Sequence, residues 1–264
     1  MSFLQSLLLG VMQGVSEFIP ISSSGHLVVL RAVLGIGEIP LLYDVILHVA
    51  TLIVVILFFR ERITRMVAAV LRWAGRRARP DDENDLKLSG LVLLGTIATV
   101  AIALIIRPLD LHNQPKIVSA AFLVTAALLI AAHFARGSIG YDRIGPRHAL
   151  IVGVVQGLAV IPGVSRSGST ITAALYSGIS REKAGEFSFI LSIPAIVGAT
   201  ILEMRHLSDL STAVSPGAMA GGFLASMVFG FLSLSLLVRL IRGGKLWVFS
   251  FYLVPLGVWG LFSL

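Results

Sequence analysis

A run of polar and helix-breaking residues, 13–26, interrupts a strongly apolar part of this sequence and carries groups that can do chemistry. Gln13 and Glu17 lie four positions apart, so both face the same side of a helix. Ser23 and His26 add a hydroxyl and an imidazole. Proteins use such groups as general bases, nucleophiles and ligands of hard cations. We therefore expect a reaction site here; the structural alternative is a carboxylate bonded to backbone at a helix break, beside serines that only cap helix ends.

The polar run has a counterpart 143 residues later in the chain. At this spacing the identical pairs are Gly10 and Gly153, Val11 and Val154, Gln13 and Gln156, Gly14 and Gly157, Ser22 and Ser165, Ser24 and Ser167, and Gly25 and Gly168. Where the first copy has Glu17, Ser23 and His26, the second has Val160, Arg166 and Ser169. In transporter folds built from inverted repeats, the site forms where broken helices of the two repeats meet. We expect the first copy to supply the reactive groups and the second to bind the substrate.

Arg166 indicates the kind of ligand. Its planar guanidinium matches phosphate oxygens bidentately, and the free N–H groups of a helix N-terminus also attract anions. An arginine at membrane depth needs a partner, so the alternative is a salt bridge to Glu17 that only locks the two halves together. We expect a phosphate site whose binding residues supply hydroxyls, an amide and close backbone approach: Gln13, Ser22, Ser24, Gly163, Ser165, Ser167, Gly168 and Thr170.

Asp44, His48 and Glu186 are less specific signals. All three lie at or near the starts of long apolar segments. His48 and Glu186 could line the cavity or support the site, but helix capping or a satisfied buried contact is the favoured interpretation for each.

The composition predicts an all-α integral membrane protein. Of 264 residues, 56% are hydrophobic and 13% are charged, whereas a soluble domain is nearer a quarter charged. The apolar runs are continuous, as in membrane helices, and a span needs about 20 residues. Six segments qualify as transmembrane helices: Leu41–Phe59, Leu88–Ile106, Ile117–Ala135, Phe187–Leu202, Gly217–Val238 and Leu246–Leu264.

Two further regions, residues 2–36 and 149–178, are too interrupted to be simple spans. Each holds a short apolar run, a Gly/Pro/Ser break and a second short run. A helix of about 11 residues is about 17 Å long, roughly half the hydrocarbon core. We therefore predict two re-entrant helical hairpins whose tips meet near the membrane midplane.

Loop charge predicts the orientation. Basic side chains gather in residues 60–87, 136–148 and 239–245, whereas the alternate loops hold only Arg107 and Lys116, or Arg205. Basic loops are cytoplasmic, which also explains the net charge of +7 without any nucleic-acid partner. Both termini then lie outside. The single membrane domain, 1–264, becomes two inverted-topology repeats, 1–135 and 148–264, each with one hairpin and three spans, and residues 60–87 form a cytoplasmic amphipathic linker.

The motifs resemble those of the bacterial undecaprenyl-diphosphatases, the UppP/BacA family. The matching features are the Gln13-x-x-x-Glu17 pair, the run from Pro20 to His26 and the run from Pro162 to Thr170, in that order and across both halves. The resemblance implies catalytic roles for Glu17, Ser23, His26 and Arg166. The reaction it implies is hydrolysis of undecaprenyl diphosphate to undecaprenyl phosphate and inorganic phosphate, which recycles the lipid carrier of peptidoglycan synthesis and confers bacitracin resistance.

The resemblance also implies a plasma-membrane enzyme whose site opens to the outer, periplasmic side, with Mg²⁺ or Ca²⁺ as a supporting cation. Because Gln13 stands where a second motif carboxylate can occur, a cation held by Glu17 would have to bridge to the diphosphate itself. The expected partners are the polyprenyl diphosphate substrate and membrane lipids. The sequence leaves open whether two copies form a homodimer. The nucleophile stays open among His26, Ser23 and water. A competing function is a polyprenyl-phosphate transporter or flippase, because broken helices at the midplane are also a transporter design.

Overall fold

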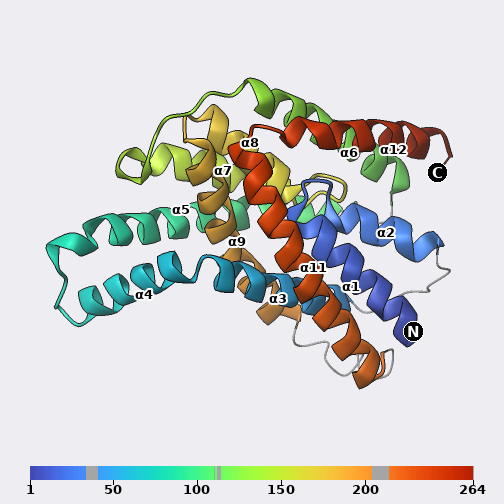
Figure 1. Cartoon of the computed structure of the whole chain (residues 1–264), viewed down its shortest axis with the longest axis horizontal. Helices are drawn as coiled ribbons and strands as arrows, with labels where there is room; N and C mark the ends of the chain where they lie inside the picture. The colour runs from blue at the N-terminus through green and yellow to red at the C-terminus, as the bar shows by residue number, and fades with distance from the viewer. Residues whose placement is uncertain (34–40, 110, 112–113, 204–213, 264) are drawn as a thin grey trace.

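The computed structural model describes residues 1–33, 41–109, 111, 114–203 and 214–263. Over these ranges the chain is helical, with one isolated β-bridge between Ile139 and Ile179. The helices are α1 (Phe3–Phe18), α2 (Ser23–Val33), α3 (Leu41–Phe58), α4 (Arg60–Ala74), α5 (Glu83–Ile106), α6 (Pro115–Phe134), α7 (Pro146–Leu158), α8 (Arg166–Tyr176), α9 (Arg181–Glu203), α11 (Pro216–Arg242) and α12 (Ser250–Ser263) (Figure 1). The predicted all-α fold is confirmed. Arg205 and the predicted hairpin end at 34–36 lie outside the described residues.

Five helical segments in the described part of the chain are long and apolar enough to cross a membrane. They contain α5, α6, α9, α11 and α12. A sixth span is obtained if α3 and α4 are taken together, although the chain bends by 83° between them. Each of the six predicted apolar segments thus coincides with one helix, and α4 begins where the predicted amphipathic linker begins.

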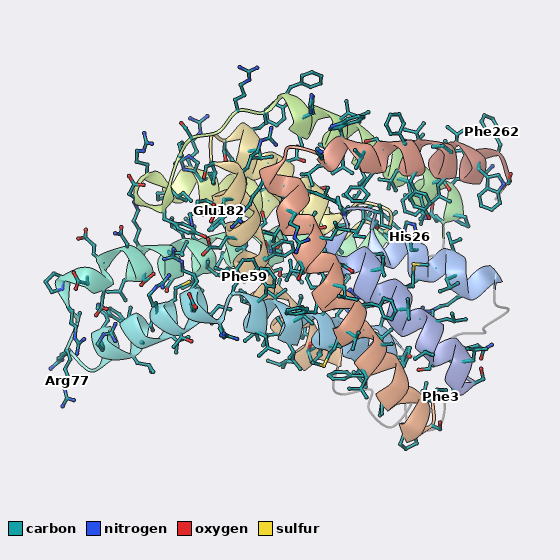
Figure 2. The ribbon with its side chains drawn as sticks, in the orientation of Figure 1. Phe3, His26, Phe59, Arg77, Glu182 and Phe262 are labelled. Carbon is teal, nitrogen blue, oxygen red and sulfur yellow. The ribbon has the colours of Figure 1, made fainter. Side chains whose placement is uncertain are left out.

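The surface of these helices suits contact with lipid. Large apolar side chains are exposed along α5, α11 and α12, among them Leu104, Leu232, Phe251 and Phe262. In water such a continuous apolar surface would be costly, whereas in a bilayer the lipid chains cover it. Figure 2 places Phe3 and Phe262 at one end of the molecule and Arg77, beyond α4, at the other.

The helix that leads into each polar run packs against a long helix through glycine: α1 against α11, and α7 against α5. A Cβ added at Gly10 of α1 would lie 2.1 Å from the carbonyl oxygen of Gly222 in α11. A Cβ added at Gly153 of α7 would lie 2.3 Å from the carbonyl oxygen of Gly95 in α5. Membrane helices approach this closely only where both surfaces are made of small residues, because packing rather than water expulsion drives their association. α1 therefore lies tightly on α11, and α7 on α5.

Candidate active site

The first polar run forms a turn between two helices. α1 ends at Phe18 and α2 begins at Ser23. Ser22, in the turn, has a φ of 73°, a left-handed conformation that is uncommon for a residue with a side chain. A backbone held in such a conformation must be stabilised by its surroundings. Here the Ser22 carbonyl accepts bonds from both the backbone N–H and the ring Nδ1 of His26, at 3.2 and 2.8 Å.

The second polar run forms the corresponding turn between α7 and α8. Gly163 has a φ of 93°, which glycine adopts without strain. The hydroxyl of Thr125 on α6 donates to the Gly163 carbonyl at 3.0 Å and accepts the Ser165 N–H at 2.9 Å. Ser165 is the N-cap of α8, and its hydroxyl accepts the Gly168 N–H at 3.1 Å. Arg166 is thereby the first residue of α8.

The two turns touch each other. The Ser167 hydroxyl donates to the carbonyl of Phe18 at 3.2 Å. A Cβ built on Gly25 would lie 3.2 Å from the Cα of Gly163, so the backbones are nearly in contact. Residues from the two halves of the sequence therefore converge on one place.

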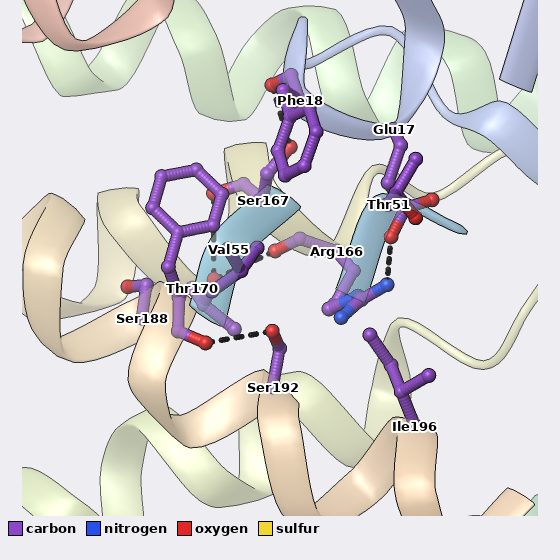
Figure 3. A pocket seen from close by; sticks show the side chains of 11 residues that line it. Glu17, Phe18, Thr51, Val55, Arg166, Ser167, Thr170, Ser188, Ser192 and Ile196 are labelled. Carbon is purple, nitrogen blue, oxygen red and sulfur yellow. Dashed lines mark hydrogen bonds and ion pairs between the residues drawn. The ribbon is translucent and has the colours of Figure 1, made fainter. Parts of the chain in front are cut away.

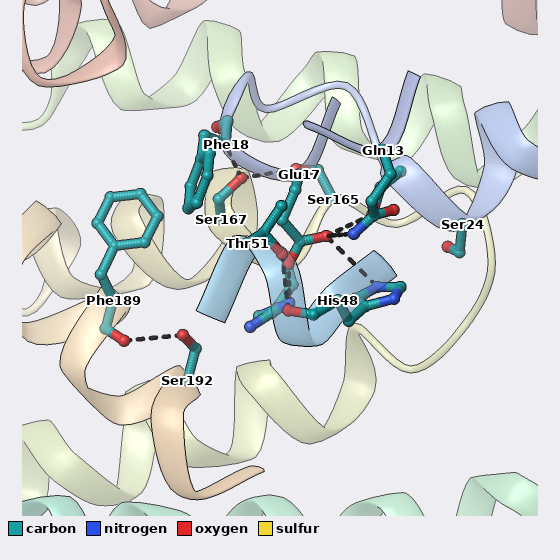
Figure 4. A network of polar contacts seen from close by, with 12 residues as sticks. Gln13, Glu17, Phe18, Ser24, His48, Thr51, Ser165, Ser167, Phe189 and Ser192 are labelled. Carbon is teal, nitrogen blue, oxygen red and sulfur yellow. Dashed lines mark hydrogen bonds and ion pairs between the residues drawn. The ribbon is translucent and has the colours of Figure 1, made fainter. Parts of the chain in front are cut away.

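Glu17 is the centre of the polar network at this junction (Figure 4). Its carboxylate forms an ion pair with Arg166, accepts the Ser23 hydroxyl at 2.7 Å and accepts the Gln13 amide at 3.1 Å. Ser23 and Gln13 both donate to Oε2, and the His48 Nε2 lies 3.4 Å from that oxygen, whereas Arg166 pairs with Oε1. Glu17 is only 9% exposed, and a buried carboxylate needs this many donors to remain charged. The salt bridge that we considered as a structural alternative is thus present, at the centre of the predicted site.

His48 is a site residue that sequence reasoning ranked too low. Its Nδ1 lies 2.8 Å from the Asp44 carbonyl, which can only accept, so Nδ1 carries a proton. Its Nε2 is directed at Glu17 and donates to the carboxylate when the ring is doubly protonated. One signal could have identified it: His48 and Thr51 lie three positions apart, on one face of an otherwise apolar span.

Two cavities flank the ion pair, and both Glu17 and Arg166 line each of them. The larger cavity measures about 180 Å³ and is lined by Ser16, Glu17, Ser22, Ser23, Ser24, His48, Ala159, Val160, Val164, Ser165 and Arg166. A phosphate group fits a space of this size, and most of its polar lining residues were predicted.

The smaller cavity also borders the ion pair of Glu17 and Arg166 (Figure 3). It measures about 10 Å³, which is close to the room that one water needs, and is lined by Glu17, Phe18, Thr51, Val55, Arg166, Ser167, Thr170, Ser188, Phe189, Ser192 and Ile196. Within the described residues the buried Ser188 hydroxyl has no hydrogen-bond partner. Thr51, Ser188 and Ser192 were not predicted. Ser188 and Ser192 are one helical turn apart on α9, which is the signal they offered.

His26 is placed differently from the other predicted catalytic residues. It lines neither cavity. Its ring is 5% exposed, stacks against Tyr252 of α12 with centroids 5.6 Å apart, and meets Phe122 edge-on at 5.2 Å. Its Nε2 lies 2.9 Å from the Tyr252 hydroxyl. His26 is therefore next to the site but directed away from Glu17.

Most of the remaining predicted residues line one of the two cavities. Ser22, Ser24 and Ser165 line the larger cavity, and Ser167 and Thr170 the smaller. Gly163 and Gly168 line neither and shape the second turn through their backbone.

Two of the acidic residues with weaker signals form ion pairs elsewhere. Asp44 pairs with Arg31. Glu186 pairs with Arg62 and Lys183, at 3.0 and 3.1 Å, and lines neither cavity.

The protein side chains alone offer few ligands for a metal. In the described part of the chain, no three His, Asp or Glu side chains gather in a way that could hold a metal ion. However, the buried Gln13 Oε1 has no hydrogen-bond partner among the described residues, and it lies on the side chain that contacts Glu17. One carboxylate and one amide oxygen fit a hard cation that takes its other ligands from a diphosphate.

Known proteins resemble this chain over almost its whole length. The family described as "Bacitracin resistance protein BacA" matches residues 6–259. A Treponema denticola protein named undecaprenyl-diphosphatase is 41% identical over 258 residues, covering 98% of this chain and 96% of its own. Proteins of the same name from Methanosphaera stadtmanae and Desulfosudis oleivorans are 36% and 38% identical, covering 98% and 96% of this chain and 96% of their own lengths.

Proposed function

Because this chain belongs to the BacA family of bacitracin resistance proteins, we propose that it is an undecaprenyl-diphosphatase of the membrane. The observation that carries the proposal is the Glu17 carboxylate, which contacts both Arg166 and the Ser23 hydroxyl in the wall of the larger cavity. A phosphate-binding cation, a base and a hydroxyl nucleophile are the parts that phosphoryl transfer requires.

The contacts support the following mechanism. The diphosphate enters the larger cavity and competes with Glu17 for the guanidinium of Arg166, with hydroxyls and the N-terminus of α8 binding further oxygens. Glu17, released from Arg166, accepts the proton of the Ser23 hydroxyl or of a water. The oxygen of that group bonds to the terminal phosphorus as the anhydride P–O bond breaks, and the lipid monophosphate leaves. If Ser23 attacks, a water then hydrolyses the phosphoserine. Glu17 must then lose the proton that it accepted. We assign His26, adjacent in α2, to carry this proton away rather than to attack phosphorus, because its ring lines neither cavity.

A divalent cation belongs to this proposal as a further component. Glu17 and Gln13 Oε1 would hold it, and it would supply positive charge for the diphosphate oxygens.

We further propose the inverted-repeat topology, with both termini outside and the site open to the outer side. Its support is reciprocal packing: α1 lies on α11 and α7 on α5, so each hairpin packs on a span of the other half. The ends that hold Phe262 and Arg77 lie far apart (Figure 2). Because the chain has no cysteine, single cysteines at these two positions, labelled from one side of sealed cells, test the topology. Labelling of both from the same side would contradict it.

Phosphate release from undecaprenyl diphosphate by the purified protein in detergent tests the function. The enzyme releases inorganic phosphate and leaves undecaprenyl phosphate. Two cavities separated by an ion pair also suit the competing transporter. Lipid movement in vesicles without phosphate release would overturn the phosphatase proposal in favour of transport.

A further inference from the structure

The hydrogen bond between His26 and Tyr252 joins residues that are 226 positions apart in the chain. The His26 Nδ1 faces the Ser22 carbonyl, and a carbonyl oxygen can only accept. In the neutral ring Nδ1 therefore carries the proton, and Nε2 is the bare nitrogen. The Tyr252 hydroxyl, 2.9 Å away, then donates to Nε2.

Tyr252 is a suitable partner for a group that gains and loses a proton. A hydroxyl donates to a bare Nε2 and, after rotating, accepts from a protonated Nε2, so the bond persists in both states. A carboxylate or a backbone carbonyl could serve only the protonated form. The stacked Tyr252 ring and the edge-on Phe122 ring also hold the plane of the imidazole.

Tyr252 lies on the last helix and lines neither cavity. Its side chain is 49% exposed, although its hydroxyl reaches a ring that is 5% exposed. It therefore has no direct path to the bound phosphate and acts on the site only through His26.

We propose that Tyr252 is a positioning residue for His26, which holds the imidazole beside the site and keeps its Nε2 hydrogen-bonded in both protonation states. The effect on turnover rests on the proposed phosphatase activity, whereas the hydrogen bond that shields the His26 Nε2 does not. Tyr252→Phe tests it, because it keeps the stacked ring and removes only the hydroxyl. Tyr176→Phe is the matched control, since its hydroxyl bonds the Ala131 carbonyl at 3.0 Å, away from the site.

The first measurement is the rate at which diethyl pyrocarbonate modifies His26, read by mass spectrometry with exposed His133 as internal reference. The reagent needs an unprotonated, unshielded nitrogen. We expect Tyr252→Phe to raise the His26 rate at least about threefold, the rise expected if the lost bond is worth about 0.7 kcal/mol, and to leave His133 unchanged. An unchanged His26 rate would overturn the proposal. This arm needs no turnover, so it stands even if the protein is not a phosphatase.

The second measurement is a kinetic double-mutant cycle. We expect Tyr252→Phe to lower kcat about tenfold with KM within twofold, and Tyr176→Phe to behave as wild type. In a His26→Ala background, Tyr252→Phe should cause no additional loss, because a residue that acts through His26 has nothing left to position. A full tenfold loss in that background would contradict the assignment. A wild type that releases no phosphate would instead contradict the proposed function.

Discussion

Arg166 and Glu17, 149 positions apart in the chain, form an ion pair in the wall that two cavities share. α8 and α1 each contribute one partner. In a low-dielectric interior each charge needs the other, so the pair stabilises the junction of the two turns. In the proposed mechanism a diphosphate replaces Glu17 as the partner of Arg166, and we therefore expect the substrate to break this pair.

Arg166→Ala should lower kcat/KM at least about 100-fold, equivalent to about 2.7 kcal/mol, because no other arginine or lysine is among the described residues that line the larger cavity. Arg166→Lys keeps the charge but loses the planar guanidinium, so its kcat/KM should lie between those of the wild type and of Arg166→Ala. Phosphate release measures both. Because the alanine variant leaves a buried charge, Arg166→Ala/Glu17→Gln should recover thermal stability but not activity. A wild-type rate in the single variant would exclude Arg166 from the site.

Ser23→Ala should also lower kcat at least about 100-fold, because it removes the hydroxyl that lies 2.7 Å from Glu17. Ser235→Ala is the matched control, since the Ser235 hydroxyl bonds the Phe231 carbonyl on an exposed face of α11. Single-turnover assays with labelled substrate would detect a phosphoserine in the wild type only if Ser23 is the nucleophile. A loss smaller than about threefold would leave water as the attacking group.

His48→Ala should lower kcat/KM about tenfold, because it removes a group that both lines the larger cavity and faces Glu17. His48→Gln keeps an N–H at a similar distance and should retain more activity. Steady-state kinetics of the two variants are the measurement. Equal losses in both would mean that His48 acts by shape rather than as a donor to Glu17.

Removal of divalent cations with a chelator should abolish phosphate release, and Mg²⁺ or Ca²⁺ should restore it. If the unpartnered Gln13 Oε1 is a ligand, Gln13→Ala should raise the cation concentration for half-maximal activity, and Gln13→Glu should lower it, because a second carboxylate adds charge. Titration of the cation at saturating lipid gives this value. An unchanged value in both variants would remove Gln13 from the cation site.

Gly10→Ala and Gly153→Ala should each destabilise the fold by about 1–3 kcal/mol, because the added methyl group would collide with the carbonyl of Gly222 or of Gly95. Gly90→Ala is the control: nothing lies within 4 Å of a Cβ there, and alanine favours a helix. Thermal unfolding in detergent compares the three. A Gly10→Ala variant as stable as Gly90→Ala would contradict the close packing of α1 on α11.

The helices of this protein could be predicted because their causes are local. Runs of apolar residues long enough to span a bilayer coincide with α3, α5, α6, α9, α11 and α12, and glycine, proline and serine mark the breaks. The association of Glu17, Ser23 and Arg166 was also predictable, since the second polar run repeats the first and inverted repeats bring such runs together.

The rest depended on how each helix is rotated about its axis and on which distant side chain meets it. Hydropathy reports that rotation poorly in a helix that is mostly apolar. The helical spacing of His48 with Thr51, and of Ser188 with Ser192, therefore indicated a shared polar face but not which site that face meets. The sequence by itself determined that Glu17, Ser23 and Arg166 belong to one candidate site, because the two polar runs repeat each other. Only the tertiary structure decided that Glu17 contacts Arg166, Ser23, Gln13 and His48 together, and that His26 faces Tyr252, because those contacts join helices that only packing brings within reach.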